Sequence, residues 1–337
     1  MPSVQSRPRL PPELLLDILD TASTRTLHSA SLVCHSWRAP AQHVLEGRLS
    51  LPTSKVARTW LSCPGRKTRT RRLSLGAGLS REESEEVFST VDGLEELLLV
   101  GNDSNSRIKF DARALQHEQL AGLKQLYVRA PFHDTRSNEP SLRFPFALTS
   151  LACKGPYRAF PASFLSALIA SSGKTLTTLD LDCYGSNPSA SAFISSLSAL
   201  TSTITHLELH GADRQTPALL DFLASCTALT TLTCWEATLP LLQALPPSLK
   251  NLDIRKDYTF HSESPYEELL TRSGLLRQLE SVRFGGISSA TLRAQVGGCE
   301  LLDECKERGI DVAFGVEVSG RYGTYGWPML GGGKMGP

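Results

Sequence analysis

The sequence predicts an α/β protein, in which a small N-terminal helical module precedes a long solenoid with a parallel concave sheet and outer helices. The first observation is an apolar pattern with the spacing L-x-x-L-x-L. It occurs eight times, beginning at Leu94, Leu123, Leu148, Leu176, Ile204, Leu229, Leu249 and Leu279. The second observation is that successive copies begin 20 to 30 residues apart, with amphipathic helical patterns between them.

The solenoid is expected to extend over residues 51–316, with a strand and then a helix in each repeat. A partial copy of the apolar pattern predicts an earlier strand at 72–76, and an alternating segment at 310–318 predicts the last, edge strand. Helices are expected at 82–91, 111–121, 161–171, 189–200, 216–225, 265–273 and 300–309. A strand and a helix repeated at this period build a curved stack with a parallel sheet on its inner side.

These copies resemble the leucine-rich repeat family in part. The strand pattern and the repeat length agree with that family. Its asparagine, expected in the turn after each strand, occurs once, as Asn102. We therefore expect irregular turns and an uneven arc.

The N-terminal segment 10–50 predicts a compact group of helices. Pro11 and Pro12 are placed to open the first helix. One apolar stripe on this helix consists of Leu14, Leu15, Ile18, Leu19 and Ala22. A second apolar series, at spacings of three and four, consists of Leu27, Ala30, Val33, Cys34 and Trp37. Such a small unit needs support from its own chain, from a partner, or from both.

Three groups in this segment resemble the F-box family: Leu10-Pro11, then Glu13-Leu14-Leu15, then Leu32-Val33-Cys34 followed by Trp37. The resemblance implies a three-helix module that binds the Skp adaptor of a cullin-type ubiquitin ligase, while the rest of the chain selects a protein substrate. It assigns adaptor contact to Leu10, Pro11, Leu14, Ile18, Leu27, Val33 and Trp37. The alternative is a helical cap on a non-catalytic repeat scaffold, because open solenoid ends need covering.

The overall charge gives no bias toward nucleic acid or anionic membranes, since 35 Lys and Arg residues face 34 Asp and Glu residues. No signal-peptide pattern or membrane span is recognised, and we expect the chain in the cytoplasm, the nucleus or both. A basic run at 66–72 is compatible with a nuclear address or a phosphate-contacting patch, but a solvated connection into the next strand is favoured. The eight cysteines include no C-x-x-C pair, which indicates buried thiols.

Both ends of the chain are expected to lie outside the folded part. Residues 1–9 are polar with two prolines and predict a flexible arm. Residues 317–337 are rich in glycine and predict a disordered tail.

The concave face is the expected binding surface, because residues between the inward apolar positions of each strand point to solvent. This face begins apolar, becomes acidic, and ends basic. Aromatic and arginine side chains beside charges are typical of protein interfaces. The candidate substrate-binding residues are Tyr127, Arg129, Asp180, Asp182, Glu208, Trp235, Arg255 and Arg283.

Five of the concave residues raise the question of a metal-dependent hydrolase, namely Asp180, Asp182, His206, Glu208 and His210. A hydrogen-bonded polar ladder is favoured over a metal site, because nothing else in the sequence indicates metal-dependent chemistry. Serine-hydrolase, zinc-protease, dinucleotide and phosphate-loop motifs are not found. We therefore expect neither an enzyme, a cofactor nor a metal.

Overall fold

The computed structural model describes residues 11–22, 24–33, 35–63, 68–101, 110–129, 142–154, 162–182, 194, 197–210, 217–234, 238–255, 276–285, 288–294 and 296–315. Within these residues, no helix has the length and apolar character needed to cross a membrane. The expected flexible arm, the glycine-rich tail, the helix at 265–273 and the irregular turns after the strands lie outside the described residues.

Three helices form the N-terminal module and are followed by alternating strands and helices. The helices are α1 (Pro12–Thr21), α2 (Thr24–Val33), α3 (His35–Glu46), α4 (Ser54–Leu61), α5 (Arg81–Thr90), α6 (Ala162–Ser172), α8 (Pro217–Ser225), α9 (Leu239–Gln243), α12 (Ser289–Arg293) and α13 (Gly298–Arg308). Three 3₁₀ helices are η1 (Ala112–Gln116), η2 (Glu118–Gly122) and η4 (Leu197–Leu200). The strands are β1 (Arg48–Leu51), β2 (Thr68–Arg69), β3 (Arg72–Gly76), β4 (Val91–Asp92), β5 (Glu96–Val100), β6 (Gln125–Arg129), β7 (Ser150–Cys153), β8 (Thr178–Asp182), β9 (His206–His210), β10 (Thr231–Cys234), β11 (Asn251–Ile254), β12 (Ser281–Gly285) and β13 (Asp311–Gly315).

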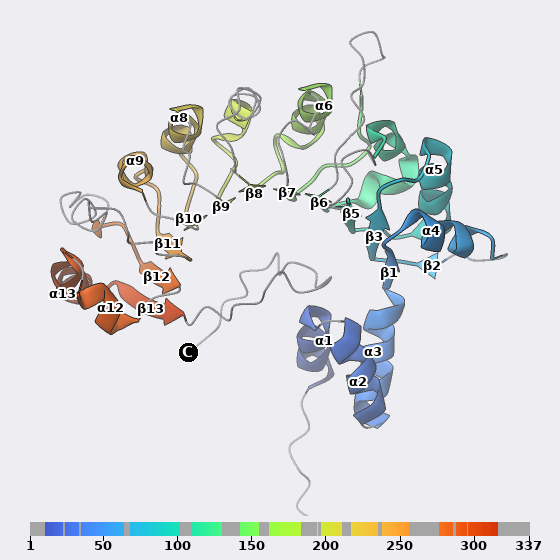
Figure 1. Cartoon of the computed structure of the whole chain (residues 1–337), viewed down its shortest axis with the longest axis horizontal. Coiled ribbons are helices and arrows are strands. Elements are labelled where there is room, and N and C mark those ends of the chain that lie inside the picture. Colours follow the sequence, from blue (N-terminus) through green and yellow to red (C-terminus); the bar gives the residue numbers. More distant parts are fainter. Residues whose placement is uncertain are drawn as a thin grey trace, which may run out of the picture.

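Eleven strands form one sheet in the order β1-β3-β5-β6-β7-β8-β9-β10-β11-β12-β13, while β2 and β4 form a separate pair. Neighbouring strands are parallel, and the register aligns the apolar positions across the sheet, as in the pairs Leu97↔Leu126 and Leu179↔Leu207. In Figure 1 the sheet follows the inner side of an arc, and the helices lie on the outer side. The chain is thus an α/β protein with a leucine-rich-repeat-like solenoid.

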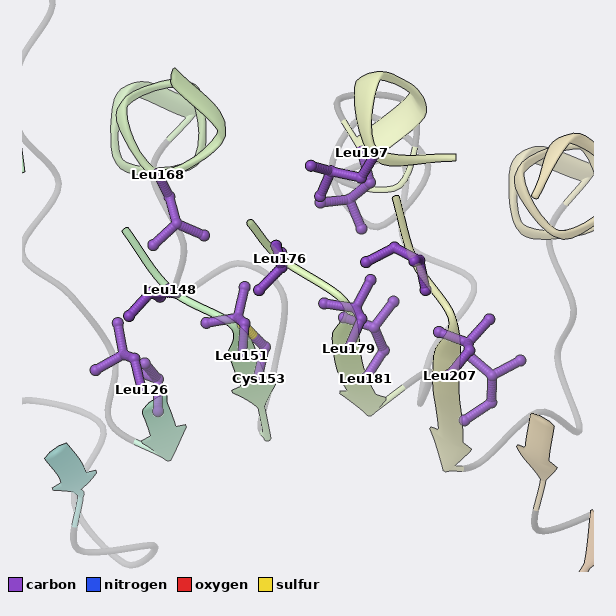
Figure 2. Close-up of a cluster of buried hydrophobic side chains, with 14 of the residues drawn as sticks. Leu126, Leu148, Leu151, Cys153, Leu168, Leu176, Leu179, Leu181, Leu197 and Leu207 are labelled. Carbon is purple, nitrogen blue, oxygen red and sulfur yellow. The ribbon is translucent and has the colours of Figure 1, made fainter. Parts of the chain in front are cut away.

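The solenoid core lies between the sheet and the outer helices. Figure 2 shows strand residues such as Leu151 and Leu179 with Leu168 and Leu197 of the outer layer above them. A single buried cluster extends from Leu51 to Ile310. Four buried cysteines belong to this core or line it, and burial raises the pKa of Cys226 and Cys234 to about 12 and that of Cys305 to about 11. The expectation of buried thiols therefore holds for these residues and for Cys153, which is fully buried.

The entry edge of the sheet is held by a repeated hydrogen-bond pattern. The carbonyl oxygen just before a strand accepts two amide protons from the next repeat, as the Thr149 carbonyl does from Thr177 and Thr178. In the middle of the sheet a threonine hydroxyl adds a third bond to the same oxygen, for example from Thr205 to the Thr177 carbonyl at 3.2 Å. Each repeat is thereby fixed to the preceding one without side chains from the core.

The strand predicted at 72–76 coincides with β3, and α5, α6, α8 and α13 fall at the helices expected there. The helix expected at 111–121 consists of two short 3₁₀ turns instead, and of the helix expected at 189–200 the structure describes only Ile194 and the 3₁₀ turn η4. At 111–121 the chain forms η1 and η2 because His117 between them has an extended backbone, with φ −64° and ψ 131°. Strand β1 and helices α4, α9 and α12 were not predicted, and β1 places the start of the sheet at Arg48, before the expected boundary at residue 51.

Gly76 lies where the chain at the end of β3 approaches the backbone that follows β1. A Cβ atom at this position would be 2.2 Å from the Pro52 carbonyl oxygen, which is part of the backbone and cannot rotate away. We expect Gly76→Ala to lower the free energy of unfolding by about 2 kcal/mol, since the backbone has to shift. Urea unfolding measures the effect. Gly122→Ala is the matched control, because its Cβ would make an ordinary 3.5 Å contact with the Leu94 carbonyl, and an equal loss there would contradict the explanation.

Candidate functional site: a helical docking module and a charged concave face

The N-terminal module has a core of its own. Leu15, Leu19, Leu27, Ala30, Ala41 and Val44 form a buried cluster that is separate from the solenoid core. Helix α3 contacts both α1 and α2, so it connects the other two helices. The module therefore folds around its own apolar residues instead of extending the core of the first repeat.

The apolar stripe predicted on α1 is divided between two faces. Leu15 and Leu19 are buried in the module core, whereas Leu14 and Ile18 are each 51% exposed. Both pairs have a spacing of four residues, so each pair lies along one side of the helix. Helix α1 thus has one apolar face for its own core and a second that is open to a partner.

The same module exposes further apolar side chains on its other helices. Leu32 is 86% exposed, Val33 73% and Trp37 37%. Of the eight exposed large hydrophobic residues in the described chain, six lie between residues 14 and 37. Apolar exposure concentrated in so short a segment is typical of an interaction site.

The seven residues assigned to adaptor contact are therefore not equivalent. Leu14, Ile18, Val33 and Trp37 are exposed, and Pro11 is exposed at the start of α1. Leu27 has no exposed surface, so the structure places it in the supporting core and not at the surface. Leu10 lies outside the described residues.

Two arginines from the first strands attach the module to the solenoid. Arg48 on β1 donates hydrogen bonds to the carbonyl oxygens of Asp20 and Ala22, the latter at 2.7 Å, at the end of α1. Arg72 on β3 donates to the carbonyl oxygen of Asp20 at 2.9 Å and to its carboxylate at 2.8 Å. Carbonyl groups at the last turn of a helix have no partner within the helix, and cations stabilise this negative end.

The junction continues into the concave face through Glu96 on β5. The Glu96 carboxylate lies 2.8 Å from Nε of Arg72, and the two side chains are only 9% and 15% exposed. The register places Arg48, Arg72 and Glu96 level on three adjacent strands. Burial and repulsion from Arg72 lower the pKa of Arg48, while Asp20 and Glu96 oppose that shift. We call Asp20, Arg48, Arg72 and Glu96 the junction cluster.

A second charged cluster lies at the middle of the concave face. The register places Asp180 on β8 directly opposite Glu208 on β9, an arrangement of like charges that is unfavourable alone. His210 lies between them, with Nε2 2.8 Å from a Glu208 oxygen and 3.2 Å from an Asp180 oxygen. Lys154 approaches Asp180 at 2.5 Å, and Arg255 approaches Glu208 at 3.1 Å. We call these five residues the central cluster.

The central cluster changes the acidity of its members. Burial disfavours the charged form of His210, but hydrogen bonds to Asp180 and Glu208 outweigh it and raise the pKa of His210. Burial would raise the pKa of Glu208, yet the hydrogen bond from His210 and the charge of Arg255 lower it. A protonated His210 and an ionised Glu208 therefore stabilise each other.

We expect His210→Gln to destabilise the protein mainly at acidic pH. Because the pKa of His210 is raised in the folded state, its stabilising effect is fully present below the unfolded value of about 6.5 and is lost as the pH rises through the folded value. Melting temperatures of the variant and the wild type should differ most near pH 5.5 and converge near pH 9. His206→Gln, an exposed histidine outside the cluster, is the control; a pH-independent difference for His210→Gln would contradict the assignment.

The central cluster also bears on the question of a metal. Ligand atoms of Asp180, Glu208 and His210 lie within 4.8 Å of one another. However, the Lys154 ammonium already occupies the cation position beside Asp180, and His206 is hydrogen-bonded to Thr205 at 2.8 Å instead of joining the group. Asp182 aligns with His210 in the register, while its side chain is not described. This geometry fits a polar ladder.

The other candidate substrate residues lie along the same face. Tyr127 is half-buried, Arg129 and Arg283 are exposed, and the Arg255 side chain is 44% exposed. Asp180 is 3% exposed, so it can influence a partner only through Lys154 and His210. Trp235 lies outside the described residues.

The junction cluster and the contact of Lys154 with Asp180 were not predicted from the sequence. A signal was present, because Arg48, Arg72 and Glu96 each stand at the first position of their strand. This pattern was not recognised because β1 was not predicted, and Arg72 was interpreted as part of the basic run at 66–72.

A comparison with known protein families identifies the N-terminal module. Residues 8–45 match the model of the F-box-like family. The N-terminal module is an F-box-like domain, and leucine-rich-repeat-like repeats follow it.

Many solved structures are similar to the chain, and two of them serve as examples. One is the leucine-rich repeat-containing protein LegL7 from Legionella pneumophila, with 17% identity, a TM-score of 0.46, and coverage of 79% of this chain and 88% of that chain. The other is a protein from Bacteroides fragilis, with 12% identity, a TM-score of 0.41, and coverage of 78% and 69%. No curated protein matches the chain significantly.

Proposed function

We propose that this chain is the substrate-recognition subunit of a cullin-type ubiquitin ligase. The F-box-like module binds a Skp adaptor, and through it a cullin, while the concave face of the solenoid binds a target protein. The observation that carries the proposal is the set of exposed apolar side chains on a module that already has a complete core. The chain performs no chemistry itself and acts by raising the effective concentration of the target near the transfer machinery.

The alternative, a repeat scaffold with a helical cap, fits these features less well. A terminal cap shields the open end of a repeat core and presents a polar outer face. Here the two cores are separate clusters, and the contacts described at the junction are hydrogen bonds and ion pairs. Six large apolar side chains of the module are exposed. A partner for this surface explains their exposure, whereas a cap does not.

Adaptor binding is the direct test. The full-length chain is titrated with a purified Skp adaptor by calorimetry, and a dissociation constant of about 1 μM or lower is expected. A folded chain that shows no binding at an adaptor concentration of about 100 μM would overturn the ligase proposal and favour the scaffold.

Adaptor binding does not test whether the concave face binds a target protein. A reconstituted ligase that contains this chain should therefore ubiquitinate proteins that bind to the concave face of the chain. Arg129→Glu with Arg283→Glu, two exposed concave positions, should reduce that transfer without changing adaptor affinity.

A further inference from the structure

The concave face has three zones that differ in what they offer a partner. On β5 and β6, the half-buried side chains of Leu98, Val100 and Tyr127 form an apolar zone, with the exposed Arg129 beside Val100 at its edge. On β7 to β9, the central cluster pairs its charges internally. Arg283 on β12 and Arg255, which directly follows β11 and also pairs with Glu208 of the central cluster, form a basic zone. The order of strands in the sheet fixes the order of these zones.

The basic zone presents cations to solvent and keeps its carboxylates recessed. The Arg255 side chain is 44% exposed, while its partners Glu208 and Asp253 are 27% and 21% exposed. Arg283 is exposed and level with Asp253. Among the described residues, no carboxylate lies within ion-pair distance of Arg283. A partner approaching this zone therefore meets guanidinium groups first.

Two glycines lie beside these arginines and allow close packing around them. Gly285 and Gly315 are aligned on β12 and β13, and a Cβ atom on Gly315 would come within 3.4 Å of the Arg283 guanidinium. A Cβ atom on Gly285 would lie 2.7 Å from the Arg255 carbonyl oxygen, so the two glycines let neighbouring strands and the Arg283 side chain pack closely at this end of the face. Carboxylates suit such a site, because planar guanidinium groups bind them through paired hydrogen bonds.

We propose that the concave face binds an extended protein segment with an apolar end and a carboxylate-rich end. Tyr127 on β6 and Arg283 on β12 are separated by six strand steps in the sheet, which is at most about 29 Å at the usual strand spacing. An extended chain covers that distance in about eight or nine residues. The apolar side chains contact β5 and β6, a polar spacer crosses the central cluster, and the carboxylates pair with Arg255 and Arg283. The proposal deepens the assignment of this face as the substrate site and rests on it.

The test uses the full-length chain and a fluorescein-labelled peptide, Leu-Leu-(Ser-Gly)₄-Glu-Glu-Glu, which has eight spacer residues. Fluorescence anisotropy should detect binding that weakens as salt increases. A peptide of the same composition with the glutamates next to the leucines should bind about tenfold more weakly, because it cannot reach both zones. Equal affinity for the two peptides would overturn the proposed spacing.

The arginines are tested separately from the fold. Arg283→Gln should lower the affinity for the peptide about tenfold, which is the loss expected for one charge-assisted contact. Arg277 is an exposed arginine outside the concave face, and Arg277→Gln should leave the affinity unchanged. An equal effect of both variants would indicate non-specific attraction and overturn the site. Tighter binding of a single-stranded oligonucleotide that also depends on Arg283 would replace the peptide with nucleic acid as the ligand.

The same protein samples are titrated with the Skp adaptor. Peptide binding without adaptor binding would support the concave face as a peptide-binding surface and reject the ligase function. Adaptor binding without any peptide binding would reject the surface and leave the function standing.

Discussion

Replacing Leu14 and Ile18 by aspartate together is expected to weaken adaptor binding by at least about a hundredfold. The two side chains are 51% exposed on one side of α1, and burying each against a partner contributes about 1–2 kcal/mol. The aspartates would remove this contribution and would also have to lose water in the interface. Calorimetric titration of the double variant with the adaptor measures the loss.

The melting temperature of this variant should change little, because Leu15 and Leu19 supply the core. Val56→Asp is the matched control, since Val56 is 43% exposed on α4 outside the module. It introduces one aspartate at an exposed apolar position, against two in the double variant, and should bind the adaptor as the wild type does. Wild-type affinity in the Leu14/Ile18 variant would show that this face of α1 is not the interface.

Arg72→Met is expected to lower the free energy of unfolding by about 3 kcal/mol. The substitution leaves the Glu96 carboxylate, which is 9% exposed, without the guanidinium 2.8 Å away, and an unpaired buried charge is strongly destabilising. Arg72→Met with Glu96→Leu should recover most of the loss, because an apolar pair can replace a buried ion pair at little cost. Urea unfolding followed by circular dichroism gives the three values.

Arg71→Gln provides the comparison for this cycle. Its side chain is 56% exposed and pairs with Glu95 at 2.8 Å, and an exposed pair of this kind contributes less than about 1 kcal/mol. A double variant as unstable as Arg72→Met would mean that the loss comes from packing and not from the stranded carboxylate. Adaptor affinity should be unchanged throughout, since the exposed apolar residues are untouched.

Periodicity predicted the solenoid because a parallel sheet repeats one contact many times. The leucine positions of each copy had to align, and the register from β3 to β12 brings them level. Periodicity did not predict the first strand of the sheet, where the repeat pattern is incomplete. Strand β1 is only four residues long and directly follows α3, so its two leucines were assigned to the helical module and its boundary.

The module shows a different limit of sequence reasoning. Leu14, Leu15, Ile18 and Leu19 all satisfy one helical stripe, and spacing alone cannot decide which pair faces the core. Packing against α3 decides it. Long-range ion pairs are likewise invisible to local patterns, because Asp20 and Arg72 lie 52 positions apart in the chain and meet only after both the module and the first strands have formed.

The junction between α3 and β1 determines where the far end of the sheet lies relative to the N-terminal module. A single residue, Gly47, separates the helix from the strand, and the sheet then extends over ten strand steps, at most about 48 Å. Because the sheet is curved, a rotation of about 10° at this junction would move the far end of the sheet by at most about 8 Å. By limiting this rotation, the junction cluster fixes the position of the last strands relative to the N-terminal module.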